Sequence, residues 1–228
     1  MRLTNEQHET LSHYLCTVGI KEQEPFEEFY DHIATGFEES HEQDLKRYIR
    51  NIAQPAFGGT EGMLRIVKEQ NKIRKSLIWN RAKEIFLGLF GWPTILVVLA
   101  SFATVYAGIT LLGQRFILLF TLSIGLLFPI LVVFYGIIKF YLSCKKAHLP
   151  YTSSNLNHWF LSMFHLPFVL LNVGGNLIIP LIVGRDAFKE FLNAYPLITI
   201  VFSTFIMLIG ITYLKLIRER FIFKITTI

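Results

Sequence analysis

The sequence predicts an all-α membrane protein, with a cytoplasmic bundle of about four short helices followed by a four-helix transmembrane bundle. Hydrophobic residues make up 52% of the 228 positions, and the mean hydropathy is +0.44. Both values are too high for a soluble domain of this length. In addition, four long segments contain no acidic or basic residue. Each is longer than the roughly 20 residues that a helix needs to cross the hydrocarbon core.

Residues 1–83 are expected to form the cytoplasmic domain and residues 84–228 the membrane domain. The polar region is itself divided by charge, because residues 1–44 have a net charge of −9 and residues 45–83 a net charge of +8. The chain's modest total of +5 therefore hides two strongly opposed segments.

The first two cytoplasmic helices have clear start and stop signals. Thr4 and Gln7 have the spacing of a capping box, and Gly19 is placed to end the first helix. Pro25 stands where a proline in the first turn is tolerated, so it predicts the start of a second helix with the sequence FEEFYDHIATGFEE.

A third helix is expected over about 42–54, ending before Pro55, because the residue that precedes a proline disfavours helical geometry. Thr60 can cap a fourth helix. Neither proline nor glycine occurs between residues 62 and 88, so this helix is expected to continue unbroken into the first membrane span.

The membrane spans are expected near 87–112, 117–141, 159–183 and 192–214. Lysine and arginine are concentrated before the first span, in the second loop and in the C-terminal tail. The positive-inside rule then predicts a multi-pass protein of the inner or plasma membrane with both termini in the cytoplasm. Cys16 and Cys144 would face the reducing side and remain free thiols.

Small residues recur every four positions in the first span, at Ala100, Thr104 and Gly108. Such spacing lets helices approach closely, either within the bundle or between protomers of a homo-oligomer.

The stretch FEEFYDHIATGFEE combines an aromatic stripe with carboxylates on the other side of the helix. A metal site would use Glu28 and His32 with a third ligand from His13, Cys16 or His41. The chain has no CxxC or HExxH motif, so we predict no metal, cofactor or catalytic residue. An enzyme would require His13, Cys16, His32 and His41 to cluster. The favoured hypothesis is a surface that binds a protein partner, formed by Glu27, Glu28, Asp31, His32, Glu38 and Glu39.

A basic stripe follows on the fourth helix, where Arg65, Lys68, Lys72 and Lys75 are spaced to share one face. Anionic lipid headgroups and internal docking of the acidic helix are equally open as partners for this stripe. A solvated helix flank that merely follows the positive-inside rule also remains open. Nucleic acid is not expected, because aromatic residues do not alternate with these charges.

The third span contains the most polar side chains, with Ser162, His165, Asn172 and Asn176 along one stripe. The favoured interpretation is structural: the two asparagines hydrogen-bond to hydroxyls of the fourth span, at Thr199, Ser203 or Thr204. The alternative is a pocket for a small ligand or ion, with His165 as its titratable member. No span has a carboxylate at its centre, which weighs against proton-coupled transport.

The N-terminal sequence LTNEQ, followed by FEEFYDHIATGFEE and AFGGTEGMLRIVKE, resembles the HAAS-type helical domain of bacterial membrane proteins associated with PadR-like regulators. The similarity covers roughly residues 3–75 and is sharpest at Asp31-His32, at the flanking Glu28 and Glu38, and at Phe57-Gly58. It does not extend to the membrane half, and the second helix is unusually aromatic for the family. The resemblance implies signalling or regulation at a membrane, without a shared catalytic activity.

The leading hypothesis is therefore a non-enzymatic signalling or regulatory membrane protein whose cytosolic domain binds a protein partner. The alternative is a transporter or permease component that uses the polar stripe of the third span.

Overall fold

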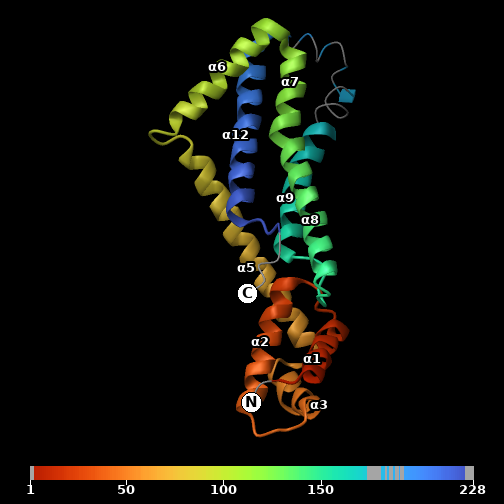
Figure 1. Cartoon of the computed structure of the whole chain (residues 1–228). Coiled ribbons are helices and arrows are strands. Elements are labelled where there is room, and N and C mark those ends of the chain that lie inside the picture. The colour runs from red at the N-terminus through yellow and green to blue at the C-terminus, as the bar shows by residue number, and fades with distance from the viewer. Residues whose placement is uncertain are drawn as a thin grey trace. The chain divides into compact units, whose positions relative to one another are not determined.

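The computed structural model describes residues 3–173, 181, 182, 184, 187, 190 and 193–223, and this part of the chain is helical (Figure 1). Its only β-pairing is an isolated bridge between Glu22 and Ser153. The all-α prediction is thus confirmed. The chain divides into two compact units: unit 1 comprises Met1–Ser76, Ile137–His158 and Ile222–Ile228, and unit 2 comprises Leu77–Gly136 and Trp159–Phe221.

Unit 1 begins with two helices whose ends follow the sequence signals. These are α1 (Asn5–Val18) and α2 (Gln23–Glu39). The Thr4 side chain and the Gln7 side chain form the predicted capping box of α1, and Gly19 ends the helix with a φ of 97°. Glycine adopts this left-handed conformation without steric cost.

The third predicted helix is present, but it differs in form and end point. It consists of α3 (Leu45–Tyr48), the π-helical segment η1 (Ile49–Ala53) and α4 (Gln54–Ala56). Asp44 caps α3 by accepting from the Lys46 and Arg47 amides. The helix does not stop before Pro55, which lies in the first turn of α4, directly after the π-helical segment η1.

The apolar core of unit 1 combines the aromatic stripe of α2 with residues far along the chain. Leu11 and Leu15 of α1 lie in it, as do Phe140 and Cys144 from α8 (Phe128–Lys146). The α2 residues in the core are Phe26, Phe29, Ile33, Ala34 and Phe37. The C-terminal part of α8 therefore belongs to the same folded unit as the N-terminal helices.

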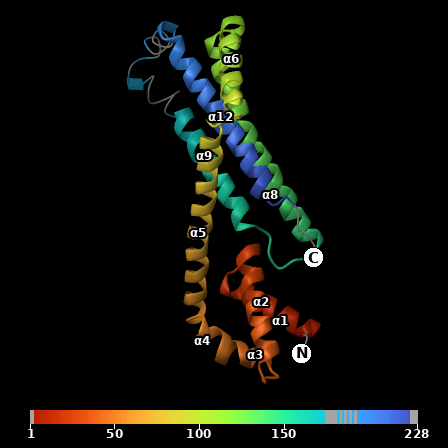
Figure 2. The same ribbon diagram turned by 90° about the vertical axis from the view of Figure 1, so that its left-hand side faces the viewer.

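The fourth helix, α5 (Gly59–Gly88), is a single uninterrupted helix of 30 residues (Figure 2). It does not continue into the first span, contrary to the sequence-based expectation. The chain turns through residues 89–94 before α6 (Ile95–Leu112) begins. The reason is Pro93, whose ring and missing N–H exclude it from a helix interior. The Thr94 hydroxyl stabilises the turn by donating to the carbonyls of Gly88 and Gly91, at 2.5 Å and 2.9 Å.

Three helices in the described part of the chain are long and apolar enough to cross a membrane: α6; the continuous run Gln114–Lys146, made of α7 (Gln114–Leu122), the π-helical η2 (Ser123–Leu127) and α8; and α12 (Pro196–Arg220). They correspond to the first, second and fourth expected spans. The expected span 159–183 is described only in part, within α9 (Asn155–Val173), so the four-helix bundle stays a prediction.

In unit 2, α12 packs against α6, α7 and η2 (Figure 1). The closest approach is at Gly210 of α12, where an added Cβ would lie 2.6 Å from the Gly125 Cα. This pair of glycines is the packing seam within the unit. By contrast, Ala100 and Thr104 of the first span are exposed, and the Thr104 hydroxyl donates to the Ala100 carbonyl of its own helix at 2.8 Å. The homo-oligomer through the first span stays a prediction.

Candidate functional site

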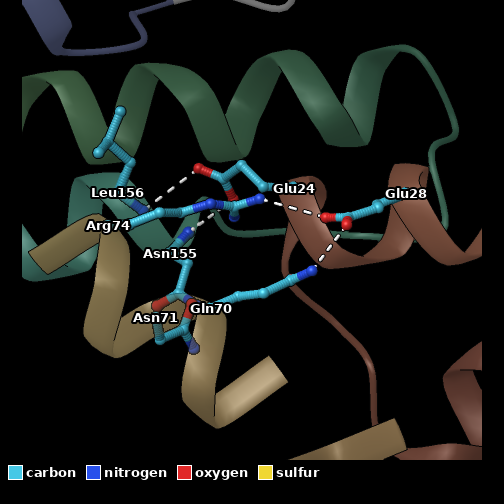
Figure 3. A network of polar contacts seen from close by, with 7 residues as sticks. All are labelled: Glu24, Glu28, Gln70, Asn71, Arg74, Asn155 and Leu156. Carbon is cyan, nitrogen blue, oxygen red and sulfur yellow. Dashed lines mark hydrogen bonds and ion pairs between the residues drawn. The ribbon is translucent and has the colours of Figure 1, made fainter. Parts of the chain in front are cut away.

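The N-terminus of α9 receives a carboxylate from a distant part of the chain. Glu24 Oε2 accepts from the Asn155 amide at 3.0 Å, and Glu24 Oε1 accepts from the Leu156 amide at 3.2 Å (Figure 3). The first amides of a helix lack acceptors within the helix, and a negative charge near them is favoured by the helix dipole. Glu24 therefore caps α9 from a helix that lies about 130 residues earlier in the chain.

The same contact also serves the N-terminus of α2. Glu22, the N-cap residue of α2, makes no side-chain capping bond. Instead, the Gln23 amide donates to the Ser153 carbonyl at 2.8 Å, beside the bridge between Glu22 and Ser153. Helix α2 thus supplies acceptors for the first turn of α9, and the residue two positions before α9 supplies an acceptor for the first turn of α2. We call this arrangement of Glu22, Gln23, Glu24 and residues 153–156 the reciprocal cap.

Ser154 and Asn157 extend the reciprocal cap toward the C-terminal segment. The buried Ser154 hydroxyl donates to Glu24 Oε1 at 2.5 Å and accepts from the Asn157 amide at 3.4 Å. The Asn157 side chain donates to the Ile222 carbonyl at 2.8 Å and accepts from the Ile222 amide at 3.2 Å. A buried polar side chain is costly unless it is paired, so these bonds fix where α9 begins relative to Ile222.

Tyr151 connects the loop before α9 to the N-terminal turns of α2. Its hydroxyl donates to Glu27 Oε1 at 2.7 Å, and its ring packs on Phe26 with the two centroids 5.6 Å apart. Burial, and then the hydrogen bond to Glu27, raise the pKa of Tyr151 above its ordinary value. The phenol therefore stays protonated and acts as a donor at neutral pH.

A second carboxylate of α2 contacts α5. Glu28 accepts from Gln70 Nε2 at 2.6 Å and forms an ion pair with Arg74 at 3.4 Å (Figure 3). The neighbouring Asn71 also contacts Asn155 through their side-chain amides. Helices α2, α5 and α9 therefore meet in one polar network.

The structure assigns different surroundings to the six residues predicted to bind a partner. Glu27 and Glu28 are engaged within unit 1, as described above. Asp31, Glu38 and Glu39 are exposed on α2. His32 is also exposed, and its ring packs beside that of Phe57 with the centroids 5.6 Å apart. Binding of a protein partner stays a prediction.

The four residues of the basic stripe are exposed on α5. The acidic helix reaches α5 through Gln70 and Arg74 instead. At 100° per residue, these two lie on the side of α5 opposite to the stripe. Internal docking of the acidic helix on the stripe was one of the alternatives left open by the sequence, and the contact that the structure shows lies on the other face of α5.

The polar stripe of the third span is described only in part. Ser162 lies on α9 and is exposed, and His165 and Asn172 fall within α9, whereas Asn176 lies outside the described residues. The proposed acceptors in the fourth span are buried. The hydroxyls of Thr199, Ser203 and Thr204 have no hydrogen-bond partner in the part of the chain that the structure describes. The expected bonds from Asn172 and Asn176 therefore stay a prediction.

The potential metal ligands are not brought together. Among the described residues, no group of three or more histidine, cysteine, aspartate or glutamate side chains could hold a metal ion. Cys16 lies near a carbonyl instead, with its Sγ 3.7 Å from the Pro150 oxygen. Both cysteines are free, as expected.

Sequence reasoning missed Glu24 and Ser154 of the reciprocal cap, and it missed Tyr151 and Asn157, which contact α2 and Ile222 beside it. A partial signal was present, since Ser153-Ser154-Asn155 before an apolar run is typical of a helix start. Nothing in the sequence indicated that the acceptor would come from Glu24. Comparison of the chain with protein-family models, with curated proteins and with solved structures finds no match. The resemblance to the HAAS-type domain therefore stays a prediction.

Proposed function

We propose that the chain is a non-enzymatic regulatory protein of the bacterial inner membrane, in which the N-terminal helical domain controls the start of the third span. The observation that supports this proposal is the reciprocal cap: Glu24 of α2 provides the acceptors for the first turn of α9. Because α9 continues from this turn to Val173, displacement of α2 would remove the cap of a helix that leads into the expected third span. Loss of a helix cap costs about 0.5–2 kcal/mol.

The composition of unit 1 supports the expected topology. The N-terminal helices, the segment Ile137–His158 and the C-terminal segment from Ile222 belong to one compact unit. These are the three regions that the positive-inside rule assigns to the cytoplasm. Their grouping in one compact unit supports the proposal that they lie on the same side of the membrane.

The signal would be binding of a protein partner with a basic surface. Asp31, Glu38 and Glu39 are exposed on α2 and extend away from Glu24 along the same helix. A partner bound there could shift α2, and the energy needed to open a single cap is small compared with typical binding energies.

The experiment uses the full chain in lipid nanodiscs and measures amide hydrogen exchange at residues 153–158. Glu24→Gln should accelerate exchange in this segment at least fivefold, because the carboxylate no longer accepts two backbone amides. Glu38→Gln is the matched control, since Glu38 lies exposed on the same helix. Unchanged exchange in the Glu24 variant would contradict the proposed control of α9.

The partner is tested by in-cell crosslinking from α2. The charge-reversed pair Asp31→Lys and Glu38→Lys should lose a crosslinked partner that the control pair Glu6→Lys and Glu9→Lys on α1 retains. The purified partner should then alter exchange at residues 153–158. A partner that binds both variants equally, or leaves that exchange unchanged, would argue against regulation through α2.

Transport is the second candidate function, and one observation favours it. Thr199, Ser203 and Thr204 bury hydroxyls without hydrogen-bond partners in the described part of α12, and polar groups within a membrane often line a cavity. Ser203→Cys in a chain with Cys16 and Cys144 replaced by serine tests this. Labelling by a membrane-impermeant thiol reagent would support a water-filled path, and protection of the thiol would argue against it.

A further inference from the structure

Helix α5 has two opposite faces with different roles. One face makes the polar contacts within the protein: Gln70 and Arg74 bind Glu28, and Arg81 binds Glu219 at 2.9 Å. The opposite face bears the basic stripe, which extends further than the sequence pattern indicated because it also includes Lys83 and an uncharged tryptophan. Its members are spaced three or four residues apart and are exposed: Arg65, Lys68, Lys72, Lys75, Trp79 and Lys83. At this spacing they form one stripe along a single uninterrupted helix.

Trp79 distinguishes this stripe from an ordinary solvated helix face. Its side chain is 48% exposed although tryptophan is among the most hydrophobic residues, and the Lys83 Nζ lies 5.9 Å from its ring centroid. Tryptophan is enriched where membrane lipids meet water, because its ring is apolar and its N–H is polar. An exposed tryptophan between lysines is therefore suited to a surface with both charge and an apolar edge.

Among the described residues, no carboxylate forms an ion pair with Arg65, Lys68, Lys72 or Lys83. The carboxylates of α2 that reach α5 bind its opposite face. On α5 itself the acidic residues are Glu61, Glu69 and Glu84. Glu61 precedes the stripe by one turn and Glu69 flanks it, which leaves an excess of positive charge. A row of cations attracts phosphate groups, and each juxtamembrane cation contributes measurably to binding an anionic membrane.

We propose that this face of α5 binds the anionic headgroups of a phospholipid bilayer, with Trp79 inserted among the headgroups and the lysines around it paired with phosphates. The Trp79 and Lys83 pair lies at the end of the stripe nearest to α6 in the chain, and Lys83 is 12 residues before Ile95, the first residue of α6. This surface is separate from the acidic face of α2 and does not depend on the proposed regulatory role.

The test places the full chain in nanodiscs of phosphatidylcholine, with or without 30% phosphatidylglycerol. Trp92 and Trp159 are replaced by phenylalanine, so that the emission reports on Trp79 alone. Phosphatidylglycerol should shift Trp79 emission to shorter wavelength and increase its quenching by brominated lipid. High salt should weaken both effects, because it screens exposed charges.

Two triple variants with the same change in net charge distinguish a specific effect of the stripe from a general effect of net charge. Lys68→Gln, Lys72→Gln and Lys83→Gln together should abolish the response to phosphatidylglycerol. Lys46→Gln, Arg47→Gln and Arg50→Gln change exposed cations on α3 and η1, and this variant should respond like the wild type.

Three outcomes would overturn the proposal. The first is Trp79 emission and quenching that do not change when phosphatidylglycerol is present. The second is an equal loss of the response to phosphatidylglycerol in both triple variants. The third is a shift of Trp79 emission that occurs only on addition of duplex DNA or an acidic protein, since this would assign the stripe to a different class of partner.

Discussion

Different interactions stabilise the interior of each of the two compact units. Unit 1 joins segments that are far apart in sequence through directed polar contacts around an apolar core, as at Glu24 and the first turn of α9. Unit 2 joins its helices through close backbone approach at Gly125 and Gly210, and it buries three hydroxyls that have no hydrogen-bond partner among the described residues. In an aqueous domain, the polar contacts specify which segments meet. In an apolar environment, glycines specify which helices meet, because they have no side chain and let two backbones approach closely. Burial of apolar surface adds little specificity there, since one apolar helix face is much like another.

The largest loss of stability is expected in the core of unit 1. Leu15 is completely buried in the core, so Leu15→Ala should lower the free energy of unfolding by about 2–5 kcal/mol. Leu64 of α5 is 43% exposed, and Leu64→Ala should cost far less. Chemical denaturation of the full chain in detergent micelles measures both. Equal losses would show that the core assigned to unit 1 does not stabilise it.

Gly210→Ala should cause the next largest loss of stability, lowering the free energy of unfolding by about 1–3 kcal/mol. The added Cβ would lie 2.6 Å from Gly125 Cα, so relief requires a shift of backbone and not of a flexible side chain. Gly88→Ala is the matched control, because nothing lies within 4 Å of a Cβ added there. Thermal unfolding in nanodiscs compares the two variants. If Gly210→Ala melts no lower than Gly88→Ala, the close contact between α12 and η2 is absent in the membrane.

Glu24→Ala should have an intermediate effect and lower the free energy of unfolding by about 0.5–2 kcal/mol, which is typical for the loss of a helix cap. The variant leaves the buried Ser154 hydroxyl and two amides of α9 without their acceptor. Asp31→Ala on the exposed side of the same helix should be close to neutral. The same denaturation experiment applies, and a neutral Glu24→Ala would mean that water replaces the carboxylate at no cost.

The residues that sequence analysis placed correctly are those whose role depends on near neighbours. The capping box at Thr4 and Gln7 involves four consecutive residues, and the aromatic stripe of α2 follows helical periodicity. The reciprocal cap depends instead on a residue about 130 positions away, and local patterns cannot specify such a partner. The small residues of the first span show the same limit. Gly108 packs closely against Ile117 of α7, whereas Ala100 and Thr104 are exposed, because spacing does not determine which helix lies opposite.

The contact between Tyr151 and Glu27 predicts a dependence of stability on alkaline pH. The pKa of Tyr151 is raised from its ordinary value of 10.0 by burial and by Glu27. The folded protein therefore holds the phenol proton more tightly than the unfolded chain does. The resulting stability is fully present below pH 10 and is lost as the pH rises above 10 toward the folded-state pKa.

Tyr151→Phe should remove this part of the loss of stability at alkaline pH. At neutral pH it should lower the free energy of unfolding by about 0.5–1.5 kcal/mol, the net contribution of one hydrogen bond. Tyr141→Phe is the control, because Tyr141 is 46% exposed. Denaturation curves at pH 8 and pH 11 measure both variants. An alkaline loss that is the same in Tyr151→Phe as in the wild type would show that Tyr151 is not the group responsible.

The smallest change in stability is expected on substitution of Ser203 in unit 2. This buried serine differs from the buried serine of unit 1 in its hydrogen bonding. The side chain is fully buried, and its hydroxyl has no hydrogen-bond partner in the described part of the chain. Removing an unpaired buried polar group avoids its desolvation cost, so Ser203→Ala should leave the thermal midpoint unchanged or raise it. In unit 1 the corresponding variant Ser154→Ala should lower the midpoint, because Ser154 both donates to Glu24 and accepts from Asn157. Two buried serines would then respond in opposite directions to the same substitution. A marked loss at Ser203 would instead reveal a bound group on this hydroxyl and would favour transport over a purely structural role for α12.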